Sequence, residues 1–281
     1  MRKKSARAAL TQLDNNNAQQ EYYLTDLAAL ANKQGLSAAY SLFEPQELMG
    51  VNSRLELSQA EAVMQERLRI KAMLGGVTLL DPTSVTLSYD TKLGQDVLIE
   101  PHCFFGPKVQ IAEGVTIKAF SHLEGCSVAE NAVIGPYARI RPQSQIAQQA
   151  RIGNFVEIKK AQIGFGSKVN HLSYIGDAKL GEKVNIGAGT ITCNYDGYFK
   201  SETEIEDGAF IGSNSALVAP VRIGKNALVA AGSTITKDVP AEAIGATRAK
   251  QSNALGREKA RRTAQEERKK QAKMNNNKDG L

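Results

Sequence analysis

Residues 93–123 read LGQDVLIEPHCFFGPKVQIAEGVTIKAFSHL, in which an apolar residue returns at every sixth position: Leu93, Ile99, Phe105, Ile111, Ile117 and Leu123. Neither the helical period of 3.6 residues nor the alternation of a half-buried strand produces a six-residue spacing. A chain that turns a corner every six residues around a three-sided coil does produce it. The stretch therefore predicts a parallel β-helix, in which each repeated apolar residue points inward and stacks on its counterpart in the next coil.

The series continues with single-residue slips through Val128, Ile134, Ile140, Ile146, Ile152, Ile158, Ile163, Val169, Ile175, Leu180 and Ile186. About eight coils of three hexapeptides would rise roughly 40 Å, at about 4.8 Å per coil. Residues 192–200, TCNYDGYFK, then displace the next expected aliphatic residue, and the count resumes at Ile205, Ile211, Leu217, Ile223, Val229 and Ile235. An insertion in a solenoid has to leave the prism as a loop, and such loops commonly carry binding groups.

Charge is concentrated at the two ends of the chain. The 281 residues include 35 Lys and Arg against 29 Asp and Glu, a net charge of +6. Residues 250–281 hold ten basic and four acidic residues and residues 1–7 hold four basic ones, which leaves the central body at −4. The charged tail has no interleaved aromatic residues, so it favours a solvated segment over a nucleic-acid or membrane surface. With neither a membrane-length apolar run nor a hydrophobic signal segment, we expect a cytoplasmic protein.

We divide the chain into four parts. Residues 1–57 form a small mixed segment, with a helix over residues 22–33 entered through Thr25 or Asp26. Residues 58–76 form a linker helix, because Ser58-Gln59-Ala60-Glu61 is a capping box and Gly75-Gly76 ends the helix. The β-helix occupies residues 77–248, and a basic tail with a helix starting near residue 253 occupies residues 249–281.

Two basic residues predict an anion site on one wall of the prism. Arg141 and Lys159 are eighteen residues apart, or three hexapeptides, so they should lie one above the other on adjacent coils. Stacked cations repel each other unless an anion lies near them, and a phosphate-bearing ligand would supply that anion. The alternative is a pair of exposed charges on a solvated wall.

His171 is the candidate general base. A neutral imidazole can accept a proton near neutral pH, and Glu157 is a plausible partner that would orient it and stabilise its charged form. Asn170 and Asn194 offer amides that could hold an amine or a carbonyl group. The alternative is a surface or packed histidine without a chemical role.

A metal centre is not predicted from the β-helix. The three histidines are not spaced at multiples of six, and no close pair of them could seed a site. Cys103, Cys126 and Cys193 are odd in number and lack a CxxC spacing, which argues against both a disulfide framework and a zinc site.

Four stretches carry a specific resemblance to a known family: residues 139–142 (RIRP), 153–160 (GNFVEIKK), 171–177 (HLSYIGD) and 184–197 (VNIGAGTITCNYDG). Together they resemble the acetyltransferase half of the bacterial bifunctional GlmU family, over about residues 77–250. That family makes UDP-N-acetylglucosamine, a precursor of peptidoglycan and lipopolysaccharide. The resemblance implies a left-handed parallel β-helix and a homotrimer with active sites between subunits.

The resemblance also implies a reaction, in which acetyl moves from acetyl-CoA to the amine of glucosamine 1-phosphate. His171 matches the general base, with Glu157 and Asn194 as further catalytic candidates. The sugar-phosphate positions are Arg141, Lys159, Tyr174 and Asn185. The acetyl-CoA positions are Ala188, Asn194, Tyr195, Ser213, Ala231 and Arg248.

The N-terminal part resembles the end of the same family's uridyltransferase domain. Residues 15–26 (NNNAQQEYYLTD) and 50–52 (GVN) carry that likeness, and Asn52 matches a Mg²⁺ position. A lone metal ligand without a partner carboxylate and a phosphate-binding loop cannot run uridyl transfer. We therefore expect a remnant of that domain, with Mg²⁺ relevant only to the missing half and no uridyltransferase activity.

Two other functions stay open at the level of sequence. One is a hexapeptide acyltransferase that acts on serine or on a different amino sugar. The other is a non-enzymatic trimer, in which the β-helix is a scaffold and the basic ends bind a partner.

Overall fold

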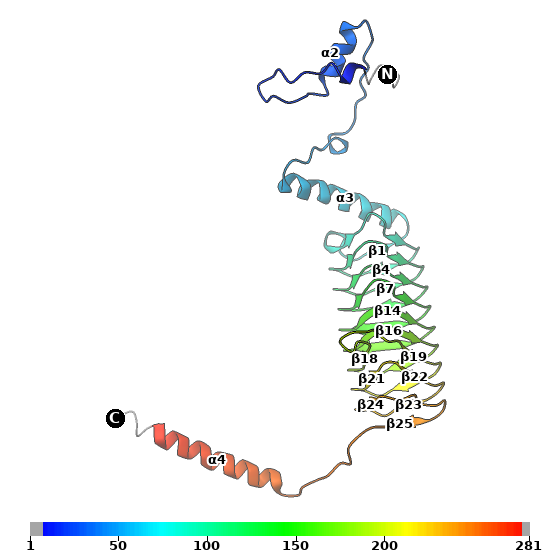
Figure 1. Ribbon diagram of the computed structural model, residues 1–281, viewed down its shortest axis with the longest axis vertical. Coiled ribbons are helices and arrows are strands. Elements are labelled where there is room, and N and C mark those ends of the chain that lie inside the picture. The colour runs from blue at the N-terminus through cyan, green and yellow to red at the C-terminus, as the bar shows by residue number, and fades with distance from the viewer. Residues whose placement is uncertain (1–7, 277–281) are drawn as a thin grey trace. The chain divides into compact units, whose positions relative to one another are not determined.

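The computed structural model describes residues 8–276, and its central part is a three-walled parallel β-helix (Figure 1). Equivalent strands on successive coils are parallel, and one coil takes 17 or 18 residues over most of the stack, as in the pairs Thr116↔Val133 and Val133↔Arg151. The predicted mainly β fold is thereby confirmed. A six-residue hydrophobic period produces it because each side of the prism has room for one short strand and one corner.

Wall A is one ten-stranded parallel sheet. Its strands, from the first coil to the last, are β1 (Thr78–Leu79), β4 (Leu98–Ile99), β7 (Thr116–Ile117), β10 (Val133–Ile134), β13 (Arg151–Asn154), β15 (Lys168–His171), β17 (Asn185–Ile186), β20 (Phe210–Ile211), β23 (Leu228–Val229) and β25 (Ile244–Gly245).

Walls B and C belong to one fifteen-stranded sheet, because the long strands β14 (Glu157–Ile163) and β16 (Tyr174–Leu180) run around the corner between them. Wall B contains the first halves of β14 and β16 together with β2 (Thr86–Leu87), β5 (Phe104–Phe105), β8 (His122–Leu123), β11 (Arg139–Ile140), β18 (Ile191–Cys193), β21 (Ala216–Val218) and β24 (Thr234–Ile235). Wall C contains their second halves together with β3 (Lys92–Leu93), β6 (Gln110–Ile111), β9 (Ser127–Val128), β12 (Gln145–Ile146), β19 (Thr203–Ile205) and β22 (Val221–Ile223).

The core follows the predicted series. Every member from Ile99 to Ile235 is buried, and Leu93, in the first complete coil, is partly buried against the others. The aliphatic residue expected after Ile186 is indeed absent, but the loop begins later than expected: Thr192 still belongs to β18, stands at the inward position and is 1% exposed. The Thr192 hydroxyl donates to the Gly176 carbonyl at 3.0 Å and accepts from the Gly176 amide at 2.8 Å, which satisfies this polar group inside the prism.

The corners use left-handed backbone conformations, repeated on successive coils. Between walls A and B the corner residues include Phe120, Tyr137, Phe155 and Leu172, with φ of 60°, 55°, 54° and 50°. The rings of Phe120, Tyr137 and Phe155 stack along this corner with centroids 4.8 and 5.2 Å apart. Stacking between coils offsets the cost of the left-handed conformation for non-glycine residues.

Contacts divide the chain into two compact units, residues 1–63 and residues 64–281. The first unit contains α2 (Asp26–Lys33), which begins after Thr25 as predicted but is shorter than the expected 22–33, and the short helix η1 (Pro45–Glu47). Helix α3 spans Arg54–Leu74 and ends before Gly75-Gly76 as expected.

The capping box of α3 was predicted at the wrong position. Ser53 and Glu56 form it, because the Glu56 carboxylate accepts from the Asn52 and Ser53 amides, both at 2.7 Å, and the Ser53 hydroxyl accepts from the Glu56 amide at 3.2 Å. These hydrogen bonds lower the pKa of Glu56, the one from the Asn52 amide contributing most. The pair Ser58 and Glu61 has the same spacing but lies inside the helix.

The second half of α3 covers the first coil of the β-helix. The buried Gln65 side chain donates to the Leu87 carbonyl at 2.7 Å and accepts from the Leu87 amide at 2.9 Å. One side-chain amide thus supplies both hydrogen bonds that a further coil would give to this strand. Next to it, Arg69 donates to the Val85 carbonyl at 3.3 Å. After the last coil, the tail forms helix α4 (Arg257–Asn276), which begins four residues later than expected.

Candidate functional site

His171 belongs to a column of residues that runs up the edge of wall A, one residue before the corner. The column contains Asn154, His171, Ala188, Ser213 and Ala231. The register of β13 with β15 aligns Asn154 with His171, and the β15–β17, β17–β20 and β20–β23 registers continue the column. The amides of residues 172, 214 and 232 donate to the carbonyls of Asn154, Ala188 and Ser213 at 3.0, 2.7 and 2.8 Å. The sequence-predicted base and three of the predicted acetyl-CoA positions therefore lie on one line parallel to the prism axis.

The partner that the structure gives to His171 is Asn154. The imidazole Nδ1 lies 2.9 Å from Asn154 Oδ1, and the His171 side chain is exposed. The expectation that Glu157 orients His171 is wrong within this chain, because Glu157 pairs with Arg141 on wall B instead. The strand register explains the difference, since it aligns Glu157 with Tyr174 beyond the corner and aligns Asn154 with His171.

Arg141 and Lys159 lie on wall B as predicted, on adjacent coils. The register Ile140↔Ile158 aligns them, and the Arg141 amide donates to the Ile158 carbonyl at 2.8 Å. Arg141 Nη1 contacts Glu157 Oε1 at 2.8 Å, and this hydrogen bond raises the pKa of the guanidinium. The stacked cations therefore already have carboxylate partners, so their repulsion alone does not require a phosphate. Arg141 Nε is buried and has no hydrogen-bond partner among the described residues.

Asp177 joins the predicted phosphate position to the inserted loop. Its side chain is 6% exposed, with Oδ2 accepting from Asn194 Nδ2 at 2.5 Å and lying 3.5 Å from Lys159 Nζ, while Oδ1 lies 3.2 Å from Lys160 Nζ. Burial alone would raise the pKa of Asp177. The hydrogen bonds from Asn194 and Lys160, with the charges of Lys159 and Lys160, outweigh burial and leave that pKa below its usual value. The carboxylate is therefore ionised at neutral pH.

The inserted segment leaves the prism as a loop, as expected, and it does so at the corner between walls B and C. It runs from Asn194, after β18, to Glu202, before β19. The loop closes on itself: the Ser201 amide donates to the Asn194 carbonyl at 2.9 Å, and Asp196 Oδ1 accepts from the amides of Tyr198 and Phe199 at 2.7 and 2.6 Å. Asn194 is buried at the base of the loop, whereas the side chain of Tyr195 is exposed at its surface.

Lys200 brings a further cation from the loop to Lys159. Hydrogen bonding to Lys159, together with the positive charge of Lys159, lowers the pKa of Lys200. The pKa of Lys159 is raised, first by the same hydrogen bond and then by the Asp177 carboxylate. One of the two ammonium groups therefore loses its proton more easily than an isolated lysine would.

The structure does not bring all the predicted residues together within one chain. Tyr174 faces outward on wall B, in register with Glu157, whereas Asn185 lies on wall A. Asn194 lies at the corner between walls B and C, at the opposite end of wall B from His171. The exposed Arg248 lies past the last strand, with its side chain beside Gly232, the residue after Ala231.

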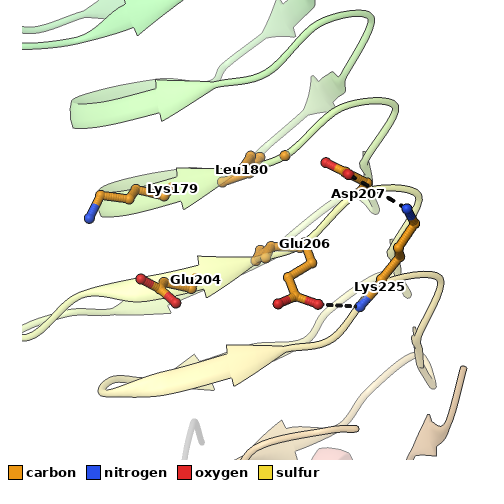
Figure 2. A pocket seen from close by; sticks show the side chains of 8 residues that line it. Lys179, Leu180, Glu204, Glu206, Asp207 and Lys225 are labelled. Carbon is orange, nitrogen blue, oxygen red and sulfur yellow. Dashed lines mark hydrogen bonds and ion pairs between the residues drawn. The ribbon is translucent and has the colours of Figure 1, made fainter. Parts of the chain in front are cut away.

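An open cavity of about 470 Å³ lies on wall C, away from this column (Figure 2). Its charged lining residues are Lys179, Glu204, Glu206, Asp207 and Lys225. Figure 2 shows two contacts among them: the Lys225 amide donates to Glu206 at 2.7 Å, and its ammonium lies 4.0 Å from Asp207. The other two have partners outside the lining, since Lys179 pairs with Glu202 at 2.9 Å and Glu204 with Arg222 at 4.0 Å. We therefore do not assign a ligand to this cavity.

Sequence reasoning missed Asn154, Lys200 and Asp177. Asn154 could have been found by counting one coil back from His171. Asp177 and Lys200 were hidden because their contacts depend on how the loop folds back over the corner.

The described residues contain no group of three or more His, Cys, Asp or Glu that could hold a metal ion. Asn52, the residue that matched a Mg²⁺ position, is exposed, and its amide donates to Glu56 at 2.7 Å. Within the described part of the chain, no helix combines the length and apolar character that a membrane crossing requires.

The fold and the sequence repeat together define a class of protein, the left-handed parallel β-helices built from transferase hexapeptides. The family described as "Bacterial transferase hexapeptide (six repeats)" matches residues 202–237. Among solved structures, LpxA from Bacteroides fragilis, a UDP-N-acetylglucosamine acyltransferase, is similar with a TM-score of 0.51 and 21% identity, over 57% of this chain and 69% of that one. At this identity the likeness supports the fold alone.

By sequence, the chain is a relative of the C-terminal half of the bifunctional protein GlmU. It is 55% identical to GlmU from Zymomonas mobilis over 87% of this chain and 54% of that protein. It is 53% identical to GlmU from Azorhizobium caulinodans over 89% and 56%, and 52% identical to GlmU from Agrobacterium fabrum over 94% and 59%. The chain thus spans about half the length of the curated relatives that it matches.

Proposed function

We propose that the chain is a glucosamine-1-phosphate N-acetyltransferase that uses acetyl-CoA. The observation that carries this proposal is the column on wall A, because it aligns the candidate base His171 with Ala188, Ser213 and Ala231 on successive coils. Three coils at about 4.8 Å each give roughly 14 Å of continuous edge. An elongated thioester ligand such as acetyl-CoA could lie along this edge, with its acetyl end near His171.

In the proposed reaction, the amine nitrogen of the sugar attacks the thioester carbonyl. His171 accepts the proton that this nitrogen loses, the carbon–sulfur bond of the tetrahedral intermediate breaks, and coenzyme A leaves as its thiol after taking up a proton. The thioester is already activated, so no acyl-enzyme is needed. The remaining tasks are to deprotonate the amine and to hold it next to the carbonyl.

The sugar phosphate is assigned to wall B. Arg141 and Lys159 face outward on adjacent coils, and Lys200 adds a cation from the loop. Counting Lys160, this group has four cations against three carboxylates, those of Glu157 and Asp177 and that of Glu124, whose charge also acts on Arg141. The remaining positive charge would suit an anionic phosphate.

We also propose that a second copy of the chain completes each site, in the homotrimer that the resemblance implies. His171 and Asn194 lie at opposite ends of wall B in one chain. A neighbouring chain that presents its loop beside the His171 corner would bring the two groups into one pocket. We place the reaction in the cytoplasm on the resemblance to GlmU.

The first experiment measures thiol release from acetyl-CoA with glucosamine 1-phosphate, glucosamine or glucosamine 6-phosphate as the acceptor. Turnover should require the 1-phosphate, and equal turnover with unrelated amino acceptors or serine would favour a different hexapeptide acyltransferase. Absence of thiol release with any acceptor, together with salt-sensitive binding to polyanions, would favour the scaffold alternative. A pyrophosphate assay with UTP, N-acetylglucosamine 1-phosphate and Mg²⁺ checks the expectation that uridyl transfer is missing.

The residue assignments are tested by substitution. His171→Ala should lower kcat by roughly 10²–10⁴-fold with a smaller change in KM, whereas His122→Ala, on wall B three coils earlier, should keep its activity. Full activity in His171→Ala would refute the base assignment. Lys159→Met and Arg141→Met should mainly raise KM for the sugar phosphate, and an unchanged KM in either variant would refute its role in phosphate binding.

A further inference from the structure

Asn154 and His171 occupy equivalent places on adjacent coils of wall A. Each is the last residue of its strand, and the β13–β15 register pairs them directly. Equivalent side chains in parallel in-register strands stand about 4.8 Å apart, so an amide and an imidazole at these places are within reach of each other. The separation of 2.9 Å between Asn154 Oδ1 and His171 Nδ1 is that of a hydrogen bond.

We infer that Asn154 is a positioning residue, which holds neutral His171 in the tautomer with its proton on Nδ1 and leaves Nε2 free to accept a proton. An amide oxygen can only accept a hydrogen bond, so the nitrogen facing it has to be the donor. The hydrogen bond made by one imidazole nitrogen thereby fixes the state of the other. The catalytic part of this inference rests on the proposed function, whereas the tautomer does not.

The backbone around the pair is tightly held. The Leu172 amide donates to the Asn154 carbonyl at 3.0 Å, and the buried Ser173 hydroxyl donates to the His171 carbonyl at 2.8 Å. Gly153, next to Asn154, approaches the coil above so closely that a Cβ there would lie 1.9 Å from the Asn170 carbonyl oxygen. These contacts fix the spacing between the two strands, so the Asn154 amide oxygen meets the imidazole at Nδ1.

The residue that follows His171 in the column cannot form a hydrogen bond with Nε2 through its side chain. By the β15–β17 register this residue is Ala188, whose methyl group neither donates nor accepts a hydrogen bond. The imidazole therefore has a hydrogen-bonding neighbour in the column on the Asn154 side and an apolar one on the Ala188 side. This asymmetry favours the tautomer protonated on Nδ1 and leaves Nε2 without a hydrogen-bonding neighbour in the column.

Without Asn154, the imidazole can carry its proton on Nε2. In that tautomer Nε2 cannot accept a proton from the substrate. When a catalytic histidine is held in the wrong tautomer, kcat falls by several orders of magnitude. His171 is exposed and would exchange between both forms, so we expect a loss of about 10- to 100-fold in kcat for Asn154→Leu. Asn154→Asp keeps an acceptor facing Nδ1 and should recover most of that loss.

The test reads the tautomer directly, in the full chain labelled with ¹⁵N-histidine. The His171 signal is assigned by its disappearance in His171→Gln, and two-bond nitrogen–proton correlations at a pH where the ring is neutral distinguish protonated Nδ1 from protonated Nε2. We expect protonated Nδ1 in the wild type and in Asn154→Asp, and a mixture or the Nε2–H form in Asn154→Leu. The signals of His102 and His122 should not change and serve as internal controls.

Thiol-release kinetics on the same three proteins complete the test. A fall in kcat with KM for both substrates within about twofold in Asn154→Leu, recovered in Asn154→Asp, supports a positioning role. Protonated Nε2 in the wild type overturns the inference, as does an unchanged tautomer and kcat in Asn154→Leu. A wild type with the expected tautomer but no thiol release refutes the proposed function and the catalytic role, while the contact between Asn154 and His171 stands.

Discussion

Replacing Asp177 by Asn should destabilise the β-helix and release the inserted loop at the same time. The change keeps the size of the side chain but removes its charge. The carboxylate now accepts from Asn194 Nδ2 at 2.5 Å and faces the ammonium groups of Lys160 at 3.2 Å and Lys159 at 3.5 Å. An amide keeps only one acceptor oxygen, so at least one of these groups would meet an N–H group instead.

The expected cost follows from these contacts. Losing one hydrogen bond to a charged group costs about 1.5–3 kcal/mol, and the pair with the largely exposed Lys160 adds less than about 1 kcal/mol. Together they give about 2–4 kcal/mol. At about 2–4 °C per kcal/mol for a domain of this size, the melting temperature should fall by roughly 4–16 °C at pH 7.

The effect should also depend on pH with a definite sign. The pKa of Asp177 is lowered in the folded chain, so its carboxylate stabilises the fold at pH values above the unfolded pKa of about 3.9. This contribution is lost as the pH falls through the folded pKa. The difference in melting temperature between wild type and Asp177→Asn should therefore be constant from about pH 8 to pH 5 and should shrink below about pH 4.

The assay is thermal unfolding monitored by circular dichroism across this pH range, together with limited proteolysis of the loop. Asp96→Asn is the matched control, because Asp96 is an exposed corner residue in the same left-handed conformation. The melting temperature of Asp96→Asn should equal that of the wild type at every pH. The reasoning is refuted if Asp177→Asn melts within 1 °C of the wild type at pH 7, or if its deficit is as large at pH 3 as at pH 7.

Two further predictions concern the cap and the thiols. Gln65→Leu should lower the free energy of unfolding in urea by about 2–5 kcal/mol, because it leaves a buried backbone amide and carbonyl of the first coil unpaired. The control Gln59→Leu, on an exposed part of the same helix, should change it by no more than about 0.5 kcal/mol. Equal stabilities of the two variants would show that the cap is dispensable. Burial raises the pKa of Cys103 to about 11 and that of Cys126 to about 12. A thiolate-selective reagent at pH 8 should therefore modify the partly exposed Cys193 first. Rapid labelling of either buried thiol would contradict this prediction.

The fold could be predicted because one strong signal dominates it. The inward position of each short strand tolerates little except aliphatic residues, so the core leaves its period in the sequence. The exception, Thr192, shows the limit of that signal. Its hydroxyl is satisfied by the backbone of the coil below, which no reading of residue types could have revealed.

The start of α3 was predicted four residues too late for a different reason. Ser53 with Glu56 and Ser58 with Glu61 have the same capping-box spacing, so sequence alone could not choose between them. The earlier pair forms the cap in the structure, where Glu56 also accepts a hydrogen bond from the Asn52 amide.

The candidate site was predicted in part. The alignment of Arg141 with Lys159 follows from the repeat, and the strand register confirms it. The predicted partner of His171, Glu157, was wrong because Glu157 lies beyond the corner, on wall B. The strand register places Asn154 beside His171 and Glu157 beside Tyr174. The burial of Asp177 depends on tertiary contacts with Asn194 and with the coil below, which the repeat does not encode.

The corners also determine where this chain can change its length. From His171 to Ala188, to Ser213 and to Ala231 the intervals along the chain are unequal, yet the four residues occupy equally spaced places on one edge. The extra residues before Ser213 are taken up by the loop that begins at Asn194, and the next coil returns to the same register. Insertions and deletions at corners should therefore be tolerated in evolution and in engineering, whereas a single residue added within a wall strand would turn every later side chain of that strand to the opposite face.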